Sequence, residues 1–188
     1  MWLFEEILRK RGIRNETRVE FWAPGPAMFG IKKYADMLSI LQRERNIIPH
    51  FKTELMSIDG PNKKATFKDN NTGAITIEDF TLLHVVPFQS PPEFIRNSKL
   101  ANATGFVDVD KHTLQSTKYP NIFGIGDCTN TPNSKTAAAI TSQAPVLVHN
   151  LERLIEGKDL NGRYNGYASC PLIISRSEVI LAEFGYDG

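Results

Sequence analysis

The sequence predicts an α/β fold of the doubly wound class. A helix, a strand and a second helix follow one another in residues 2–45, which is the order of a doubly wound unit. Short alternating segments broken by turn residues occupy 46–86 and indicate a small β-meander. The stretch Tyr119–Ala139 then reads as a buried strand, a glycine turn and an alanine-rich helix.

The composition is that of an ordinary globular protein. The 188 residues suffice for a domain with a real core, and the formal net charge of +1 gives no electrostatic footprint for nucleic acid. No apolar run approaches the ~20 residues that a membrane-spanning helix needs. The first residues, MWLFEEILRKRG, form a charged amphipathic pattern, so no targeting segment is recognised.

The first elements are defined by their spacing and their ends. Apolar residues at helical spacing predict a helix over Trp2–Arg11, which ends at Gly12. Alternation predicts a strand over Arg18–Trp22, and a second amphipathic helix is expected over Lys32–Arg45. Between them, Pro24–Gly30 is expected to be a loop.

The meander is marked by the turn residues at 59–62 and 70–73. After it, Thr81–Val86 is apolar enough for a strand buried on both faces. Three prolines follow at 87, 91 and 92, and we place the crossing between two domains in this loop. Near the end of the chain, Glu178–Phe184 is expected to form a strand.

A long helix is expected to begin at Ser134 or Lys135. It carries apolar residues at alternating steps of four and three positions, and this spacing predicts that they form one buried stripe. They are Ile140, Ala144, Leu147, Leu151 and Leu154. Pro145 lies inside the helix and should kink or break it, because proline removes a backbone donor.

The stretch Tyr119–Ala139 also has the pattern of a ligand site. The strand Ile122–Ile125 would bring Asp127 to its carboxyl end, where open α/β sheets bind ligands, and Gly126 would let a ligand approach the backbone. The helix start adds free N–H groups, and Lys135 adds a positive charge. Both features suit a flavin. A turn followed by a capped surface helix would give the same pattern.

Several segments resemble the sulfide:quinone oxidoreductases of the eukaryotic mitochondrial type, in the same order along the chain. They are FGIKKYADML, LLHVVPFQSPP, GFVDVDKHTL, GIGDCTN with SKTAAA, and YNGYASCPLIISRSEVILAEFGYDG. The resemblance implies a partial FAD/NAD(P)-binding, glutathione-reductase-like fold, truncated at both ends. Residues 1–90 would form an incomplete NAD-like domain with the meander, and 91–188 the C-terminal portion of the FAD-binding domain.

The resemblance also implies the chemistry. The family oxidises sulfide to a protein-bound persulfide and passes the electrons through FAD to ubiquinone, and a sulfite or thiol accepts the sulfur. It associates peripherally with the mitochondrial inner membrane. One of its two redox cysteines matches Cys170, and the other is absent from this chain. The matching FAD contacts are Gly126, Asp127, Lys135, Thr136, Ala137 and Ala138.

The remaining candidates are assigned to structure. Cys128 is expected to be a small buried residue, since the family does not use this position for redox work. From the residue alone Cys170 would be structural too, on a turn before Pro171, and only the resemblance makes it catalytic. The two cysteines lack the spacing of a zinc site, so no metal is expected. The four histidines do not cluster in the sequence either; they are His50, His84, His112 and His149.

Two alternatives stay open. A type II NADH:quinone dehydrogenase relative would share the flavin motif but would need a glycine-rich nicotinamide turn, for which Ala23–Pro26 is a poor candidate. A non-catalytic remnant or interaction module would keep only the fold. The chain has no G-x-G-x-x-G after a strand, so we expect weak FAD binding or none, and no activity of these residues alone.

Overall fold

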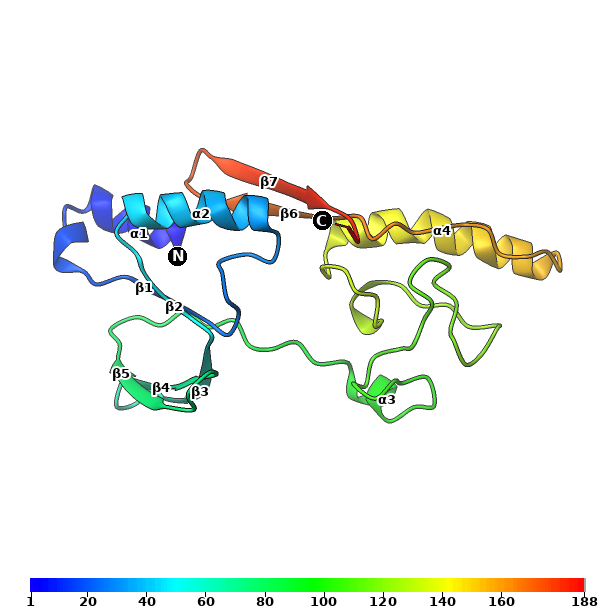
Figure 1. Cartoon of the computed structure of the whole chain (residues 1–188), viewed down its shortest axis with the longest axis horizontal. Helices are drawn as coiled ribbons and strands as arrows, with labels where there is room; N and C mark the ends of the chain where they lie inside the picture. Colours follow the sequence, from blue (N-terminus) through cyan, green and yellow to red (C-terminus); the bar gives the residue numbers. More distant parts are fainter. Residues whose placement is uncertain (188) are drawn as a thin grey trace. The chain divides into compact units, whose positions relative to one another are not determined.

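The computed structural model describes residues 1–187 and divides the chain into two compact units (Figure 1). The first unit comprises Met1–Val86 and Ile173–Val179, and the second comprises Pro87–Leu172 and the described residues from Ile180 onward. The architecture is mixed α/β, as predicted. The assignment of 1–90 and 91–188 to an NAD-like and an FAD-binding domain stays a prediction.

A βαβ arrangement forms the centre of the first unit. Strands β1 (Glu20–Ala23) and β2 (Ile48–Phe51) pair in parallel, and α2 (Lys32–Glu44) connects them; α1 (Trp2–Lys10) and η1 (Arg14–Glu16) precede them. Both predicted helices are confirmed within one residue at their ends. The first strand starts two residues later than predicted because its ladder begins at the pair Glu20 and Ile48. Leu8, Val19 and Ile47 form the core.

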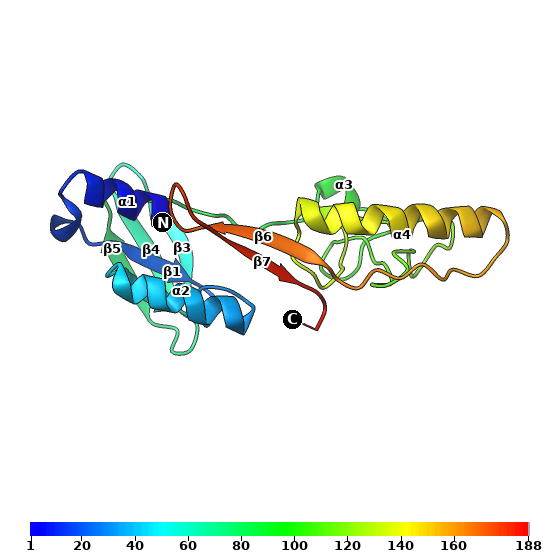
Figure 2. The ribbon, with the colours of Figure 1, turned by 90° about the horizontal axis from the view of Figure 1, so that it is seen from above.

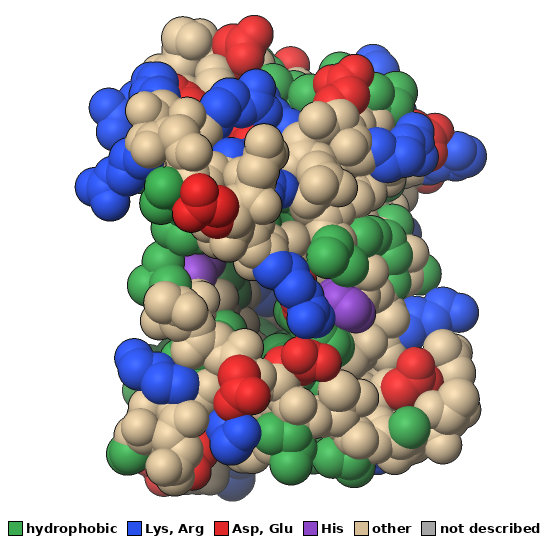
Figure 3. Space-filling view, turned by 90° about the vertical axis from the view of Figure 1, so that its left-hand side faces the viewer, with side chains coloured by type: hydrophobic (Ala, Val, Ile, Leu, Met, Phe, Trp, Pro, Cys, Tyr) green, Lys and Arg blue, Asp and Glu red, His purple; other side chains and the backbone are tan. Residues whose placement is uncertain are grey.

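A buried carboxylate ties the helix ends of this unit together. The side chain of Glu5 is 1% exposed and lies 2.8 Å from Arg9, 3.4 Å from Arg14 and 3.9 Å from Arg45. Arg14 donates to the carbonyls of Thr17, Arg45 and Asn46. Figure 3 shows that basic and acidic side chains are also intermixed on one face of the protein.

The predicted meander is confirmed as an antiparallel sheet of β3 (Thr53–Asp59), β4 (Lys64–Asp69) and β5 (Ile75–Asp79). Its two turns lie at the predicted positions, and the carboxylates of Asp59 and Asp69 accept turn N–H groups. A hydrogen bond from the Asn62 side chain, together with the backbone bond, lowers the pKa of the Asp59 carboxyl, and the backbone bonds lower the pKa of the Asp69 carboxyl. Strand β2, whose residues the sequence pattern included in this region, pairs instead with β1.

The prediction of a buried strand at Thr81–Val86 is wrong. No helix or strand is formed there, and Leu82 and Val86 are 67% and 80% exposed. An apolar segment becomes a strand only where a neighbour completes its backbone hydrogen bonds. None of the strands in the described part of the chain pairs with it.

The second unit contains α3 (Glu93–Arg96), η2 (Gly126–Cys128), α4 (Ala137–Ile155) and most of β6 (Ala168–Ile173) and β7 (Val179–Phe184). The turn between these two strands, with Ile173 and Val179, belongs to the first unit. Strand β7 confirms the predicted last strand. The predicted strand Ile122–Ile125 is wrong: only Phe123 forms a bridge, to Gln115. Backbone hydrogen bonds from Ser116 N–H to the Ile122 carbonyl and from Gly124 N–H to the Leu114 carbonyl flank this bridge, but the contact is too short to form a strand.

Helix α4 differs from the prediction at its start and on its faces. Thr136 is the N-cap, so the helix begins at Ala137, not at Ser134 or Lys135. Pro145 lies inside it without breaking it (Figure 2). The predicted buried stripe is wrong in part, because Ile140 and Leu151 are each 38% exposed. The buried residues are Ala139, Gln143 and Asn150, on the side that contacts the loops of the unit.

Candidate functional site

The site begins where the chain turns at Gly126. This residue has φ +74°, a conformation that favours glycine, and a Cβ there would meet the Ile140 side chain at 3.2 Å. The Gly126 N–H donates to Oε1 of Gln143 at 2.8 Å, and its carbonyl accepts from the Thr129 hydroxyl at 2.9 Å. Since Gln143 is 1% exposed, these bonds hold the turn against α4.

The first turn of α4 supplies backbone donors beside this loop. The Thr136 hydroxyl accepts from Ala139 N–H at 3.2 Å, which satisfies one of the free donors. The N–H groups of Ala137 and Ala138 come at the first two helical positions and have no intrahelical acceptor. With the positive end of the helix dipole, they can donate to anionic or carbonyl oxygens of a ligand.

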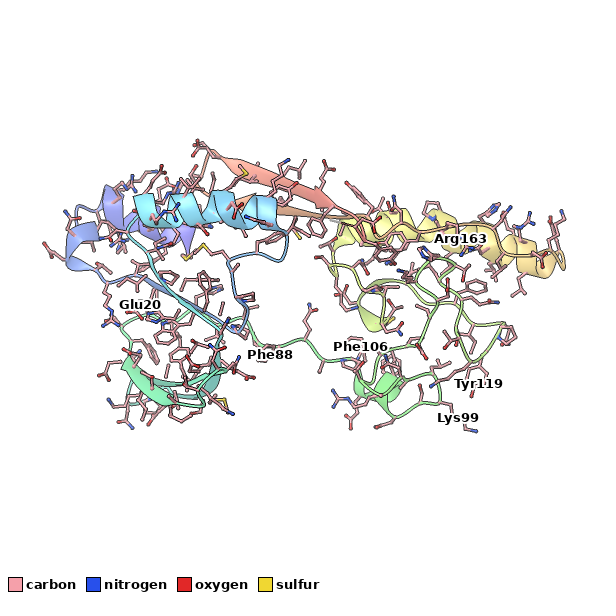
Figure 4. All side chains as sticks on the ribbon, in the orientation of Figure 1. Glu20, Phe88, Lys99, Phe106, Tyr119 and Arg163 are labelled. Atoms are coloured by element: carbon pink, nitrogen blue, oxygen red, sulfur yellow. The ribbon has the colours of Figure 1, made fainter. Side chains whose placement is uncertain are left out.

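Asp127 and Lys135 are the charged members of the site. The side chain of Asp127 is exposed, and no hydrogen bond or ion pair is found for it among residues 1–187. Lys135 Nζ donates to the Thr129 carbonyl at 2.6 Å and lies 4.9 Å from the Phe106 ring, which Figure 4 labels. Burial lowers the pKa of Lys135, and the nearby Asp127 and Cys128 oppose that shift.

A second layer of polar side chains lies behind this loop. Thr129 and Thr131 share a hydrogen bond of 2.8 Å and are buried. Asn133 Nδ2 donates to the Tyr164 hydroxyl at 3.0 Å, and that hydroxyl donates to the Tyr167 carbonyl at 2.6 Å. The sequence reasoning missed Gln143, Asn133 and Tyr164, because no local pattern shows which polar residues will face the loop.

An unpaired buried acceptor in this layer supports a bound ligand. Oδ1 of Asn133 is buried without a hydrogen-bond partner, which costs free energy unless a ligand group donates to it. The other components fit part of a flavin dinucleotide: a free carboxylate for a hydroxyl, helix N–H groups for oxygens, and a lysine charge. The residues present therefore fit FAD over part of its length.

The two cysteines have different surroundings. Cys128 donates to the Ile125 carbonyl at 3.3 Å and packs against the cluster of Ile95, Val107 and Val109, as expected of a structural residue. Cys170 lies within β6 rather than on a turn. Burial raises the pKa of the Cys170 thiol. The ammonium of Lys135 donates to the Thr129 carbonyl.

Three of the histidines have separate partners. His112 Nδ1 is 3.0 Å from the Tyr164 carbonyl, His149 bonds Asn161, and His50 lies 3.4 Å from Glu20 in the first unit. In the described part of the chain, no three His, Cys, Asp or Glu side chains are grouped to hold a metal ion. Within the same residues, no helix has both the length and the apolar content to cross a membrane.

Sequence comparison identifies relatives of this chain. It is 47% identical over 99% of its length to the mitochondrial sulfide:quinone oxidoreductase of Schizosaccharomyces pombe, and 48% identical over 99% to that of Dictyostelium discoideum. The chain is homologous to part of the mitochondrial sulfide:quinone oxidoreductases. It spans about 41% of the length of both relatives. No family model matches the chain. The resemblance seen in its sequence segments is confirmed.

Solved structures confirm the fold class. The chain aligns over 97% of its length with the sulfide:quinone oxidoreductase of Aquifex aeolicus, at TM-score 0.74 and 24% identity, and covers 49% of that chain. It aligns over 99% of its length with a chain of the mitochondrial ATP synthase of Tetrahymena thermophila, at TM-score 0.85 and 25% identity, and covers 46% of that chain. The sulfide:quinone oxidoreductase fold thus extends over both units.

Proposed function

We propose that these residues form part of an FAD-dependent sulfide:quinone oxidoreductase. The observation that carries the proposal is the identity of 47–48% with two such proteins over 99% of the chain. In this reaction sulfide loses two electrons and becomes sulfane sulfur, while ubiquinone takes up two electrons and two protons. A sulfite or thiol would then accept the sulfur, at the mitochondrial inner membrane.

The chain's own residues would hold FAD at the turn before α4. The exposed carboxylate of Asp127 would accept from a ligand hydroxyl, and Gly126 leaves room for close approach. Lys135 would place its charge beside the ligand, while Thr136 caps the helix so that Ala137 and Ala138 keep free N–H donors. When bound, FAD would supply the two-electron transfer between sulfur and quinone.

Cys170 would carry the sulfur chemistry of this chain. A thiol must lose its proton to attack sulfur, and burial raises the pKa of Cys170 in the present structure. The thiolate therefore needs a donor or positive charge that these residues do not place beside it. This is one reason why we expect the 188-residue chain alone to have no sulfide oxidation activity and to bind FAD weakly.

Three measurements on the protein from its natural source test the proposal. A mass above 21.1 kDa with stoichiometric flavin absorbance and sulfide-dependent quinone reduction would support it. Cys170→Ser should abolish that activity, and Cys128→Ser should keep most of it as the matched control. Flavin-loaded protein that reduces quinone with NADH but not with sulfide would instead favour the type II NADH:quinone dehydrogenase.

One observation favours a second candidate function. The TM-score of 0.85 with a chain in a mitochondrial ATP synthase structure supports use of this fold as a subunit of a larger assembly. An interaction module of this kind would bind no flavin and would have no redox activity. A protein of 21.1 kDa that purifies without flavin and within a larger complex would favour this candidate.

A further inference from the structure

Tyr164 is a buried tyrosine behind the candidate flavin loop, residues 126–135. After α4 the chain turns back along the helix (Figures 1 and 2). There the side chain of Asn150 donates to the Gly162 carbonyl and accepts from its N–H. Tyr164 is 1% exposed, and its backbone N–H donates to the His112 carbonyl at 2.8 Å. Its position is therefore fixed by segments outside the loop.

The hydroxyl of Tyr164 has a defined pattern of donor and acceptor. It donates to the Tyr167 carbonyl at 2.6 Å, because a carbonyl can only accept. Its oxygen can then accept, and Asn133 Nδ2 donates to it at 3.0 Å. The same Nδ2 also donates to the Ser134 carbonyl at 3.0 Å. The Asn133 amide cannot flip without losing both bonds, so its orientation is fixed.

A second amide is bonded to the same hydroxyl. Oε1 of Gln143 accepts from the Gly126 N–H at 2.8 Å, so Nε2 is the atom left to bond Tyr164. Burial raises the pKa of the Tyr164 hydroxyl, and the side-chain hydrogen bond with Gln143 opposes that shift. One hydroxyl therefore connects the Gly126 turn, at the start of the loop, with Asn133 near its end.

One acceptor of this network stays unpaired. Oδ1 of Asn133 is buried and has no hydrogen-bond partner among residues 1–187. Since Nδ2 is held by two acceptors, Oδ1 cannot exchange places with it and can be satisfied only by an N–H or O–H group. A flavin dinucleotide carries donors of both kinds, on its ring and on its ribityl and ribose chains.

We propose that Tyr164 is a positioning residue of the flavin site, and that Asn133, which it holds, accepts a hydrogen bond from an N–H or O–H group of the flavin. This role rests on the proposed function. Tyr164 acts through the amides of Asn133 and Gln143 and not by contact with the ligand. A tyrosine that only stabilises the fold would affect flavin binding independently of Asn133.

A double-mutant cycle on flavin affinity tests this role. Tyr164→Phe and Asn133→Ala are made singly and together in the protein at its natural length. Tyr164→Phe keeps the buried ring and removes only the hydroxyl, so we expect flavin affinity to fall about tenfold. Asn133→Ala should cause a similar loss, and the double variant should bind at most about twofold more weakly than either, because both changes remove one interaction.

Tyr167→Phe is the matched control for the lost hydroxyl. It removes a hydrogen bond of the same length, 2.6 Å, from a tyrosine three residues away to Glu183, and it leaves the Tyr167 carbonyl in place. Its flavin affinity should stay within about twofold of wild type. Additive losses in the cycle, or an equal loss in Tyr167→Phe, would overturn the positioning role.

Hydrogen exchange by mass spectrometry supplies a test that needs no flavin. In the flavin-free protein, residues 126–135 should exchange faster in Tyr164→Phe than in wild type, and Tyr167→Phe should match wild type. Unchanged exchange in Tyr164→Phe would overturn the role. Faster exchange in a protein whose wild type binds no flavin would support positioning of the loop by Tyr164 and contradict the proposed function.

Discussion

The two units bury different kinds of side chain. In the first unit, α2 packs its Tyr34, Ala35 and Leu38 inward, and Glu5 is the one buried charged or polar residue among those described. The second unit holds the other five: Ser116, Thr129, Thr131, Gln143 and Asn150. The first unit is thus held mainly by apolar packing. The second adds directed hydrogen bonds of buried polar side chains to its apolar core.

The largest loss of stability is expected from a change of Glu5, the buried charged residue of the first unit. Glu5→Gln removes the carboxylate that faces three guanidinium groups, and breaking such a buried pairing costs about 3–5 kcal/mol. Urea unfolding followed by tryptophan fluorescence measures it, since both tryptophans, Trp2 and Trp22, lie in this unit. The exposed Glu16→Gln is the control. Equal stability of the two variants would contradict a stabilising role of the Glu5 carboxylate.

A somewhat smaller loss of stability is expected from a change of Asn150 in the second unit. Asn150→Ala removes its hydrogen bonds to the carbonyls of Thr113 and Gly162 and from the Gly162 N–H, at about 1 kcal/mol net for each bond. Circular dichroism should show the lower unfolding midpoint while the tryptophan signal stays close to wild type. A shift in both signals would mean that the units unfold together.

A change of Gly126 should lower the free energy of unfolding by a smaller amount. Gly126→Ala adds a Cβ at positive φ and 3.2 Å from Ile140, for which we expect about 1–2 kcal/mol of destabilisation. Gly60→Ala is the control, because nothing lies within 4 Å of its added Cβ. Flavin titration of the protein should show weaker binding for Gly126→Ala alone. Identical flavin affinity in the two variants would contradict the placement of FAD at this turn.

The smallest effect on stability is expected from ionisation of the Cys170 thiol. Burial raises its pKa, so the folded thiol stays protonated to higher pH than an unfolded one. The unfolded chain loses this proton first, and the stability contributed by the group falls as pH rises past the ordinary cysteine value of ~8.5. Alkylation by iodoacetamide, followed by mass spectrometry in Cys128→Ser, should have its midpoint above that value. A midpoint below pH 8 would show an activated thiol.

The sequence predicted the elements whose own residues determine them. Helices α1 and α2 have local stop signals and apolar spacing, and the meander has Asp59 and Asp69 at its turns. It failed at Thr81–Val86 and Ile122–Ile125, since strands there would depend on hydrogen bonds from distant segments. The predicted burial of the apolar stripe of α4 is wrong in part, since Ile140 and Leu151 are exposed, because periodicity alone does not say which side of a helix packs against the rest of the unit.

The candidate site was predicted in outline only. Gly126, Asp127 and Lys135 stand out because glycine turns and charges have local signatures. Gln143, Asn133 and Tyr164 come from 7 to 38 residues beyond the turn and are brought to it by folding. The flavin and sulfur roles of the predicted residues stay proposals, and they rest on homology together with this geometry.

Hydrogen exchange by mass spectrometry tests the contrast between the two helices most directly. In the 188-residue chain, amides of residues 139–151 in α4 should exchange faster than those of residues 35–43 in α2, because α4 is held by side-chain hydrogen bonds at Gln143 and Asn150, whereas α2 packs apolar side chains inward. Equal, strong protection of both helices in the chain alone would contradict the account.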